Sequence, residues 1–297
     1  MTILDKKRID RIIRFALKED IRTGDVTSKA VIDRFLDADA VILAREKGII
    51  AGMDMVERTF AAVDCSLKFR PLVKDGERIT PETEIAFIEG NAQAILKGER
   101  TALNFLGMLS GISTRTRELV ETVKGTDVKI YDTRKTIPLH RYLQKYAVTV
   151  GGGYNHRDGL WDMVLLKDNH LKAFGMQKKI TDPAEIIKSI IRHTRDSVQK
   201  NIKIEIEVET LKECEAALRE KPDVIMLDNM PFEMVQKAVI MRKEKKLEGV
   251  VLFEVSGGIN KRNIKDFAPC GIDIISIGAL TSSLTPVDFS LEVIFRK

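Results

Sequence analysis

The sequence has few cysteines and no spacing that pairs them. Cys65, Cys214 and Cys270 are the only three in 297 residues, and they stand far apart with no CxxC spacing. A disulfide framework uses an even set of cysteines in a short chain, and a zinc site uses closely spaced pairs. Neither is indicated, and a reducing compartment, the cytoplasm, fits the composition best.

Long apolar runs are also missing. The first twenty residues, MTILDKKRIDRIIRFALKED, interrupt their apolar positions with charges every few residues, and no long apolar run follows. A signal peptide or a membrane span needs a continuous apolar segment. We therefore expect neither secretion nor a membrane partner.

A strong charge bias is absent too. The net charge of +5 comes from 49 basic and 44 acidic residues spread along the chain. Nucleic-acid binders concentrate their basic residues on one face. We therefore expect no nucleic-acid partner, and the net charge by itself names no other.

The sequence does contain two successive patterns, of which the first ends near residue 115. Residues 6–19 predict an amphipathic helix, because apolar residues recur there at helical spacing, namely Ile9, Ile12, Ile13 and Leu17. Short apolar runs separated by DG and EGN turns predict a small antiparallel sheet with a helix near residues 53–63. Helix-forming residues from 93 to 123 predict one or two long helices.

The second pattern begins after Gly125. Short β-branched runs alternate there with helical segments, and the runs are VKIYDTRK, DMVLLKDN, IKIEIEVE, DVIMLDNM, VVLFEVSGG and IDIISIGAL. Such alternation implies parallel strands joined by crossover helices. Six units of this kind favour an α/β fold with a (β/α) barrel over an open doubly wound sheet.

Polar residues stand at the carboxyl ends of these predicted strands, on the face where barrels carry their active sites. They include 132–135, Lys167, Glu207, Asp228, 256–258 and Gly278. The cations among them match a substrate with several anionic groups, and the carboxylates match Mg²⁺. Interior strand positions are expected to be apolar, as packing requires.

Small residues recur after three of the runs. The triplet Gly151 to Gly153 lies between cations, where it is either a flexible loop or a segment whose backbone N–H groups or close packing lie next to an anion. SGGI at 256–259 and IGAL at 277–280 follow the last two strands. Small residues at that point are a recurrent phosphate-binding arrangement.

Three histidines and one tryptophan are candidates for contact with a metal or a ligand. His140, His156 and His170 lie close in sequence but in no HxH or HExxH spacing, which favours hydrogen bonding or substrate contact over zinc. Trp161 follows the HRDGL turn and is interpreted as a packing anchor.

Eight motifs run in order along the chain, after EDIRTGDVTS near its start. They are GERTALNFLGMLSGIST (98–114), DTRKTIP (132–138), KYAVTVGGGYNHRDGL (145–160), LLKDNH (165–170), EIEVE (205–209), IMLDN (225–229), EVSGGI (254–259) and SIGAL (276–280). Together they resemble the quinolinate phosphoribosyltransferase family, the carboxylating nicotinate-nucleotide pyrophosphorylases.

The resemblance implies a domain plan and a reaction. Residues 1–115 would form an α/β sandwich, 116–285 an incomplete (β/α) barrel of the type II phosphoribosyltransferase kind, and 286–297 a segment packing back on the first domain. Two subunits would share their active sites in a homodimer. Quinolinate and phosphoribosyl pyrophosphate would give nicotinate mononucleotide, pyrophosphate and CO₂ with Mg²⁺, a step of NAD biosynthesis.

The resemblance also implies roles for individual residues. Around quinolinate it places Thr133, Arg134, Lys135, His156, Arg157 and Lys167, with Arg100 offered across the dimer interface. It assigns the ribose hydroxyls and the metal to Glu207 and Asp228, which with Lys135 and Lys167 are the expected catalytic residues. It assigns the 5′-phosphate to Ser256, Gly257, Gly258, Gly278 and Ala279.

Two motifs depart from the family pattern, and two other functions stay open. The usual TTPG reads Thr136 to Leu139 with Ile137 and Leu139 altered, and the usual ALTHS has Ser282 in place of histidine. The complete LLKDNH favours the biosynthetic enzyme over a related branch associated with molybdenum-transport operons. A relative acting on nicotinate or another base is one alternative, and a non-catalytic anion-binding protein is the other.

Overall fold

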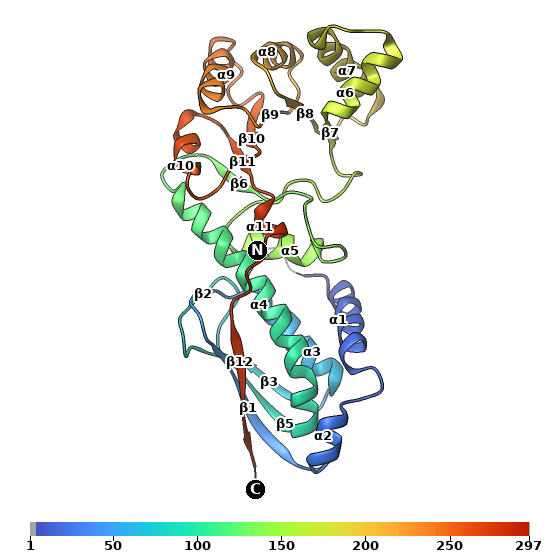
Figure 1. Cartoon of the computed structure of the whole chain (residues 1–297), viewed down its shortest axis with the longest axis vertical. Coiled ribbons are helices and arrows are strands. Elements are labelled where there is room, and N and C mark those ends of the chain that lie inside the picture. The colour runs from blue at the N-terminus through green and yellow to red at the C-terminus, as the bar shows by residue number, and fades with distance from the viewer. Residues whose placement is uncertain (1–3, 297) are drawn as a thin grey trace. The chain divides into compact units, whose positions relative to one another are not determined.

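The computed structural model describes residues 4–296 and divides them into two compact units (Figure 1). Unit 1 contains the described residues up to 118 together with 137–152 and those from 280 onward, and unit 2 contains 119–136 and 153–279. Each unit is therefore assembled from segments that are distant in the sequence. None of the described helices combines the length and the apolar character needed to cross a bilayer.

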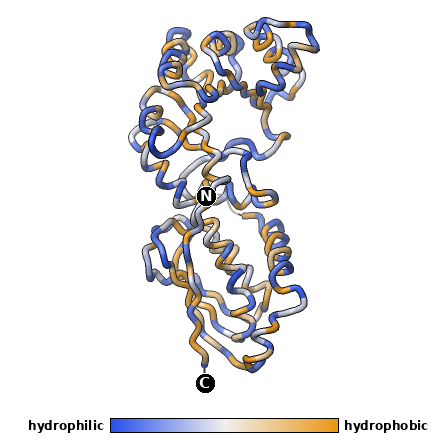
Figure 2. The backbone as a smooth tube through the Cα atoms, viewed as in Figure 1, coloured by the Kyte–Doolittle hydropathy of each residue, from blue (hydrophilic) through white to orange (hydrophobic). Residues whose placement is uncertain are grey.

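Unit 1 is built on a four-stranded antiparallel sheet in the order β12-β1-β5-β3. Its strands are β1 (Asp37–Ala44), β3 (Lys68–Pro71), β5 (Glu84–Asn91) and β12 (Phe289–Phe295), and a separate pair joins β2 (Gly48–Ile49) to β4 (Arg78–Ile79). β12 is mostly orange in Figure 2, because all its residues except Ser290 and Glu292 are Phe, Leu, Val or Ile.

The helices of unit 1 include α1 (Lys6–Ile21), α2 (Val26–Val31), α3 (Met53–Val63), α4 (Ala92–Thr122) and α5 (Arg141–Val150). The core cluster contains Phe60 of α3, Leu106 of α4 and Ile42 of β1, so α3 and α4 cover the sheet. The predicted opening helix and the helix near 53–63 are confirmed, and the long helical region is a single helix, α4.

Two of the three consecutive glycines have a structural reason, which is close packing at Gly151 and a positive φ at Gly152. Gly151 ends α5, and a Cβ at this position would lie 2.6 Å from the Ser113 carbonyl of α4. Arg117 of α4 donates from Nε to the Gly151 carbonyl over 2.9 Å. Gly152 follows with φ of 94°, which favours glycine. The first two glycines therefore let α5 end directly against α4.

Unit 2 is a parallel six-stranded sheet in the order β6-β11-β10-β9-β8-β7. The strands are β6 (Lys129–Tyr131), β7 (Val164–Leu166), β8 (Ile204–Val208), β9 (Val224–Asp228), β10 (Leu252–Ser256) and β11 (Ile274–Ser276). Within the described residues, the end strands β6 and β7 form no ladder with each other. The expected α/β architecture with an incomplete barrel is confirmed.

Crossover helices connect these strands as the alternating pattern predicts. They are α6 (Asp168–Lys178), α7 (Pro183–Ser197), α8 (Leu211–Glu220), α9 (Phe232–Glu244) and the short α10 (Ile264–Phe267), while α11 (Ala279–Ser282) follows β11. Buried residues of α7 at Ile187, Ile190 and Ile191 recur at helical spacing, which explains why this segment lies on the sheet.

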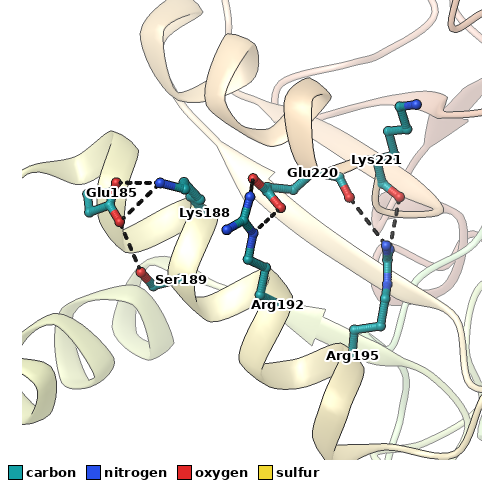
Figure 3. A network of polar contacts seen from close by, with 7 residues as sticks. All are labelled: Glu185, Lys188, Ser189, Arg192, Arg195, Glu220 and Lys221. Carbon is teal, nitrogen blue, oxygen red and sulfur yellow. Dashed lines mark hydrogen bonds and ion pairs between the residues drawn. The ribbon is translucent and has the colours of Figure 1, made fainter.

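Arginines of α7 fix the end of α8, as Figure 3 shows. Arg192 binds the Glu220 carboxylate with Nε at 2.7 Å and Nη2 at 2.9 Å. Arg195 donates to the main-chain carbonyls of Glu220 at 3.3 Å and Lys221 at 2.9 Å. The last carbonyls of a helix have no partner within it, so these contacts cap α8 from its neighbour.

Candidate active site

The inner face of the unit 2 sheet carries buried carboxylates among apolar side chains, which corrects the expectation of a wholly apolar interior. Along β8, Ile204, Ile206 and Val208 alternate with Glu205 and Glu207. Successive side chains of a strand point to opposite faces. Glu205 of β8 and Glu254 of β10 are 0% and 1% exposed, respectively, so the interior contains buried carboxylates.

The segment after β6 is tied to the segment that follows the glycine triplet. Asp132 is fully buried, and its Oδ1 accepts the His156 N–H over 2.9 Å. The Lys135 N–H donates to Thr133 Oγ1 over 3.0 Å, which turns the chain at the strand end. The structure thus brings 132–135 and 156–157 together, although 20 or more residues separate them.

Two guanidinium groups lie close together in this part of the site. The pKa of Arg157 is lowered by burial and by the positive charge of Arg134. Nη1 of Arg157 donates to the Met163 carbonyl over 3.0 Å. The Arg134 Nε is buried, and no described residue accepts its hydrogen bond. A buried and a half-buried guanidinium with an unused donor are suited to binding an anion with planar oxygen pairs, such as a carboxylate.

His156 faces two carboxylates. Its Nε2 lies 3.1 Å from Glu205 Oε2 and 3.4 Å from Glu254 Oε2. Burial opposes protonation, whereas hydrogen bonding and the charges of the two glutamates act to raise the pKa of His156. The Arg157 N–H opposes this rise as well, because it donates to Nδ1 over 2.8 Å and a protonated Nδ1 could not accept it.

The hydrogen bond at Nδ1 decides where the protons of this cluster lie. It favours a neutral ring with its proton on Nε2, the atom that faces the two glutamates. Burial and the charge of Glu254 raise the pKa of Glu205 to about 7.

Carboxylates gather at the ends of β8 and β9. Glu207, Asp228 and Asp168 line a cavity of about 280 Å³ with Glu209 and Glu213. Burial raises the pKa of Glu207, while the ion pair with Lys167 opposes the rise. Several carboxylate oxygens around one cavity form the hard donor set that Mg²⁺ takes. The residues present therefore fit this ion.

Two glycine turns stand at the ends of β10 and β11. Gly257 and Gly258 have φ of 89° and 66°, a region that favours glycine. A Cβ at Gly278 would lie 2.8 Å from Cδ of Lys135 and 3.3 Å from Oγ1 of Thr133. The Gly278 turn and the 132–135 segment are thus neighbours, as a shared phosphate and base site requires.

Other predicted positions have simpler surroundings. Arg100 is exposed on α4 in unit 1, whereas the other predicted site residues belong to unit 2. His170 accepts the Lys167 N–H at Nδ1 over 2.9 Å and so caps α6. Trp161 is 77% exposed and is not a packing anchor, because the loop that carries it leaves the indole uncovered.

Sequence reasoning did not single out Glu205 and Glu254. The signal was present, since the strict alternation of IEIEVE places its glutamates on one face of a strand. Interior strand positions were expected to be apolar, whereas the structure places Glu205 inside.

Comparison with known proteins gives a consistent family. The family profiles described as Quinolinate phosphoribosyl transferase, N-terminal domain and C-terminal domain match residues 25–110 and 112–292. A probable nicotinate-nucleotide pyrophosphorylase (carboxylating) of Methanocaldococcus jannaschii is 41% identical, covering 96% of each chain. A quinolinate phosphoribosyltransferase (decarboxylating) of Nicotiana tabacum is 37% identical over 96% of this chain and 82% of the relative.

Solved structures agree with these matches. NadC from Streptococcus pyogenes superposes with a TM-score of 0.92 at 36% identity, covering 100% of both chains. The nicotinate-nucleotide pyrophosphorylase of Francisella tularensis gives 0.88 at 35% identity over 98% of both chains.

Proposed function

The chain belongs to the quinolinate phosphoribosyl transferase family, and from this premise we propose that unit 2 binds quinolinate and phosphoribosyl pyrophosphate at the strand ends. The enzyme transfers the phosphoribosyl group to quinolinate with decarboxylation, which yields nicotinate mononucleotide, pyrophosphate and CO₂ for NAD biosynthesis. The names (carboxylating) and (decarboxylating) describe this one reaction in its two directions.

The adjacent guanidinium groups of Arg134 and Arg157 carry the proposal for quinolinate. Quinolinate has two neighbouring carboxylates, and two guanidinium forks within range of each other's charge can take one each. A single carboxylate, as in nicotinate, would leave one of these charges without a counter-charge. This difference favours quinolinate over nicotinate as substrate.

The remaining groups suit phosphoribosyl transfer. The ribose C1 becomes oxocarbenium-like as pyrophosphate leaves, and Glu207 and Asp228 can stabilise that positive centre and hold the ribose hydroxyls. We propose that the same two carboxylates hold Mg²⁺, which when bound neutralises negative charge on the pyrophosphate. Lys135 and Lys167 supply cations for the departing charge and for the carbanion left by decarboxylation. No protein nucleophile is needed.

The phosphate cradle and the assembly are further parts of the proposal. The turns at 256–258 and 278–279 offer backbone N–H groups for the 5′-phosphate. Arg100 is proposed to reach the site of a second subunit in a homodimer, which would place its exposed side chain beside quinolinate. The cytoplasm is proposed as the compartment, because the three cysteines are free.

One incubation tests the reaction. Purified protein with phosphoribosyl pyrophosphate and Mg²⁺ receives either quinolinate or nicotinate, and mononucleotide and CO₂ are followed. We expect both products from quinolinate alone. Mononucleotide from nicotinate without CO₂ would favour the alternative base, whereas quinolinate binding with no product would favour an anion-binding protein.

A further inference from the structure

Three side chains form a buried cluster inside the unit 2 sheet. His156 comes from the loop before β7, Glu205 from β8 and Glu254 from β10, and their side chains are 8%, 0% and 1% exposed. Burying a carboxylate is costly unless a proton or a cation faces it. Both oxygens of Glu205 are buried without a hydrogen bond of regular geometry to a described residue, and His156 Nε2 lies 3.1 Å from Oε2. The imidazole is thus the group these glutamates face.

The ring orientation follows from its other nitrogen. The Arg157 N–H donates to Nδ1 over 2.8 Å, so Nδ1 presents its lone pair and the ring proton lies on Nε2. Nε2 is the atom between the two carboxylates. The pair of glutamates therefore favours the one tautomer that can accept from Arg157.

A metal centre is the competing use of these residues. Their ligand atoms lie within 4.8 Å of one another, and they line a cavity of about 340 Å³. A metal at Nε2 would require its lone pair and would move the ring proton to Nδ1. That proton would then face the Arg157 N–H, so the observed hydrogen bond disfavours a metal.

We propose that Glu205 and Glu254 are positioning residues for quinolinate: they hold the His156 tautomer that fixes the main chain at Arg157. Asp132 holds the preceding N–H of His156 over 2.9 Å. The main-chain N–H groups of His156 and Arg157 are then both hydrogen-bonded, which fixes the backbone from which the Arg157 side chain extends near Arg134. The inference rests on the proposed function, since it assigns Arg157 to the dicarboxylate.

The first test reads the tautomer directly and needs no substrate. Histidine ¹⁵N NMR of the wild-type protein at neutral pH should show His156 protonated on Nε2 and bare on Nδ1, identified by comparison with His156→Gln. Added Zn²⁺ or Mg²⁺ should leave both resonances unchanged. A proton on Nδ1, or a metal-induced shift of Nε2, would overturn the proposal.

The second test separates charge from shape. Glu254→Met removes the acceptor at similar size, and we expect it to raise the quinolinate Kd about ten-fold with less than about a two-fold change for phosphoribosyl pyrophosphate. Glu254→Gln keeps a carbonyl acceptor and should restore most of the affinity. Equal loss for both ligands, or an unchanged quinolinate Kd, contradicts the positioning role.

A failure of this inference can be distinguished from a failure of the proposed function. A wild-type protein that does not bind quinolinate would end the assignment of the substrate, while the NMR tautomer would still report on the cluster. If Glu254→Met does not fold, Glu205→Met takes its place, because it too removes an acceptor only on the side of the ring at Nε2. Loss of the Nε2 proton signature in that variant supports the proposal, and its retention with wild-type affinity contradicts it.

Discussion

The side-chain carboxamide of Asn229 occupies the space beside Gly257 in which any other residue would place its Cβ. A Cβ built at Gly257 overlaps both the Oδ1 and the Nδ2 atoms of Asn229. Asn229 itself has φ of 51° and donates from Nδ2 to Asp228 over 2.8 Å. The proposed phosphate turn and the proposed metal ligand are thus linked through one asparagine.

Gly257→Ala should therefore destabilise the protein more than Gly258→Ala does. We expect a loss of about 2–3 kcal/mol in unfolding free energy, because the alanine needs φ of 89° and must also displace Asn229. Gly258→Ala is the matched control, with nothing within 4 Å of its Cβ. Its expected cost is about 1 kcal/mol. Urea denaturation measures both, and equal costs would show that Asn229 moves freely.

Leu139→Gly should stabilise the protein. Leu139 has φ of 67° at the position where the family motif ends in glycine, and its side chain is 90% exposed. Relief of backbone strain should exceed the added entropy of the unfolded chain and give a net gain of about 0.5–1 kcal/mol. Leu139→Ala keeps the Cβ and should change stability little. A gain of the same size in both variants would place the effect in the leucine side chain instead.

Arg134→Lys should weaken quinolinate binding although it keeps the charge. Lysine lacks the fork and the buried Nε that Arg134 presents, so we expect the quinolinate Kd to rise by about ten-fold or more. Arg219→Lys on α8 is the control, because Arg219 is paired with Glu215 outside the site. Calorimetric titration measures both, and equal affinity in the two variants would remove Arg134 from the site.

Removal of Mg²⁺ with EDTA should abolish turnover, and Asp228→Asn should raise the Mg²⁺ concentration needed for half-maximal rate by about ten-fold or more. Glu215→Gln serves as the control, since Glu215 lies in a surface ion pair with Arg219. Turnover that persists in EDTA would contradict the proposed metal requirement.

The cysteines should react in a fixed order with iodoacetamide. The thiolate is the reactive form, and burial raises the pKa of the Cys214 thiol to about 12, which leaves about one thiolate in 10⁴ at pH 8. Cys65 is exposed and should be alkylated first. The raised pKa of Cys214 favours the folded state below its unfolded pKa, and this contribution is lost as pH rises through about 12. Mass spectrometry at pH 8 gives the order, and early labelling of Cys214 would show local opening.

The fold was predictable where the sequence repeats a period. Alternating strands and helices after Gly125 gave the parallel sheet, because β-branched runs and amphipathic segments differ in period. The amphipathic pattern of residues 141–150 shows only that one face of α5 is buried, and the close contact at Gly151 was needed to show that α5 ends against α4.

The candidate site was predictable at strand ends and not inside the sheet. Arg134, Lys167 and Asp228 follow apolar runs directly, so their placement needs only the barrel topology. Glu205 and Glu254 required knowledge that one histidine returns from a distant loop to face them. Sequence spacing contains no such information, since His156 and Glu254 belong to segments that only the folded chain brings together.

β1 pairs with β12, a strand that the ribosome makes long after β1. Ala38 stands opposite Phe295 and Ala44 opposite Phe289, so this later strand completes the sheet that contains β1. At typical elongation rates this edge of β1 stays without its partner for on the order of tens of seconds. An unpaired strand edge can associate with other chains during that interval. The nascent protein therefore depends on β12, and on whatever covers β1 until β12 is made, to fold without aggregating.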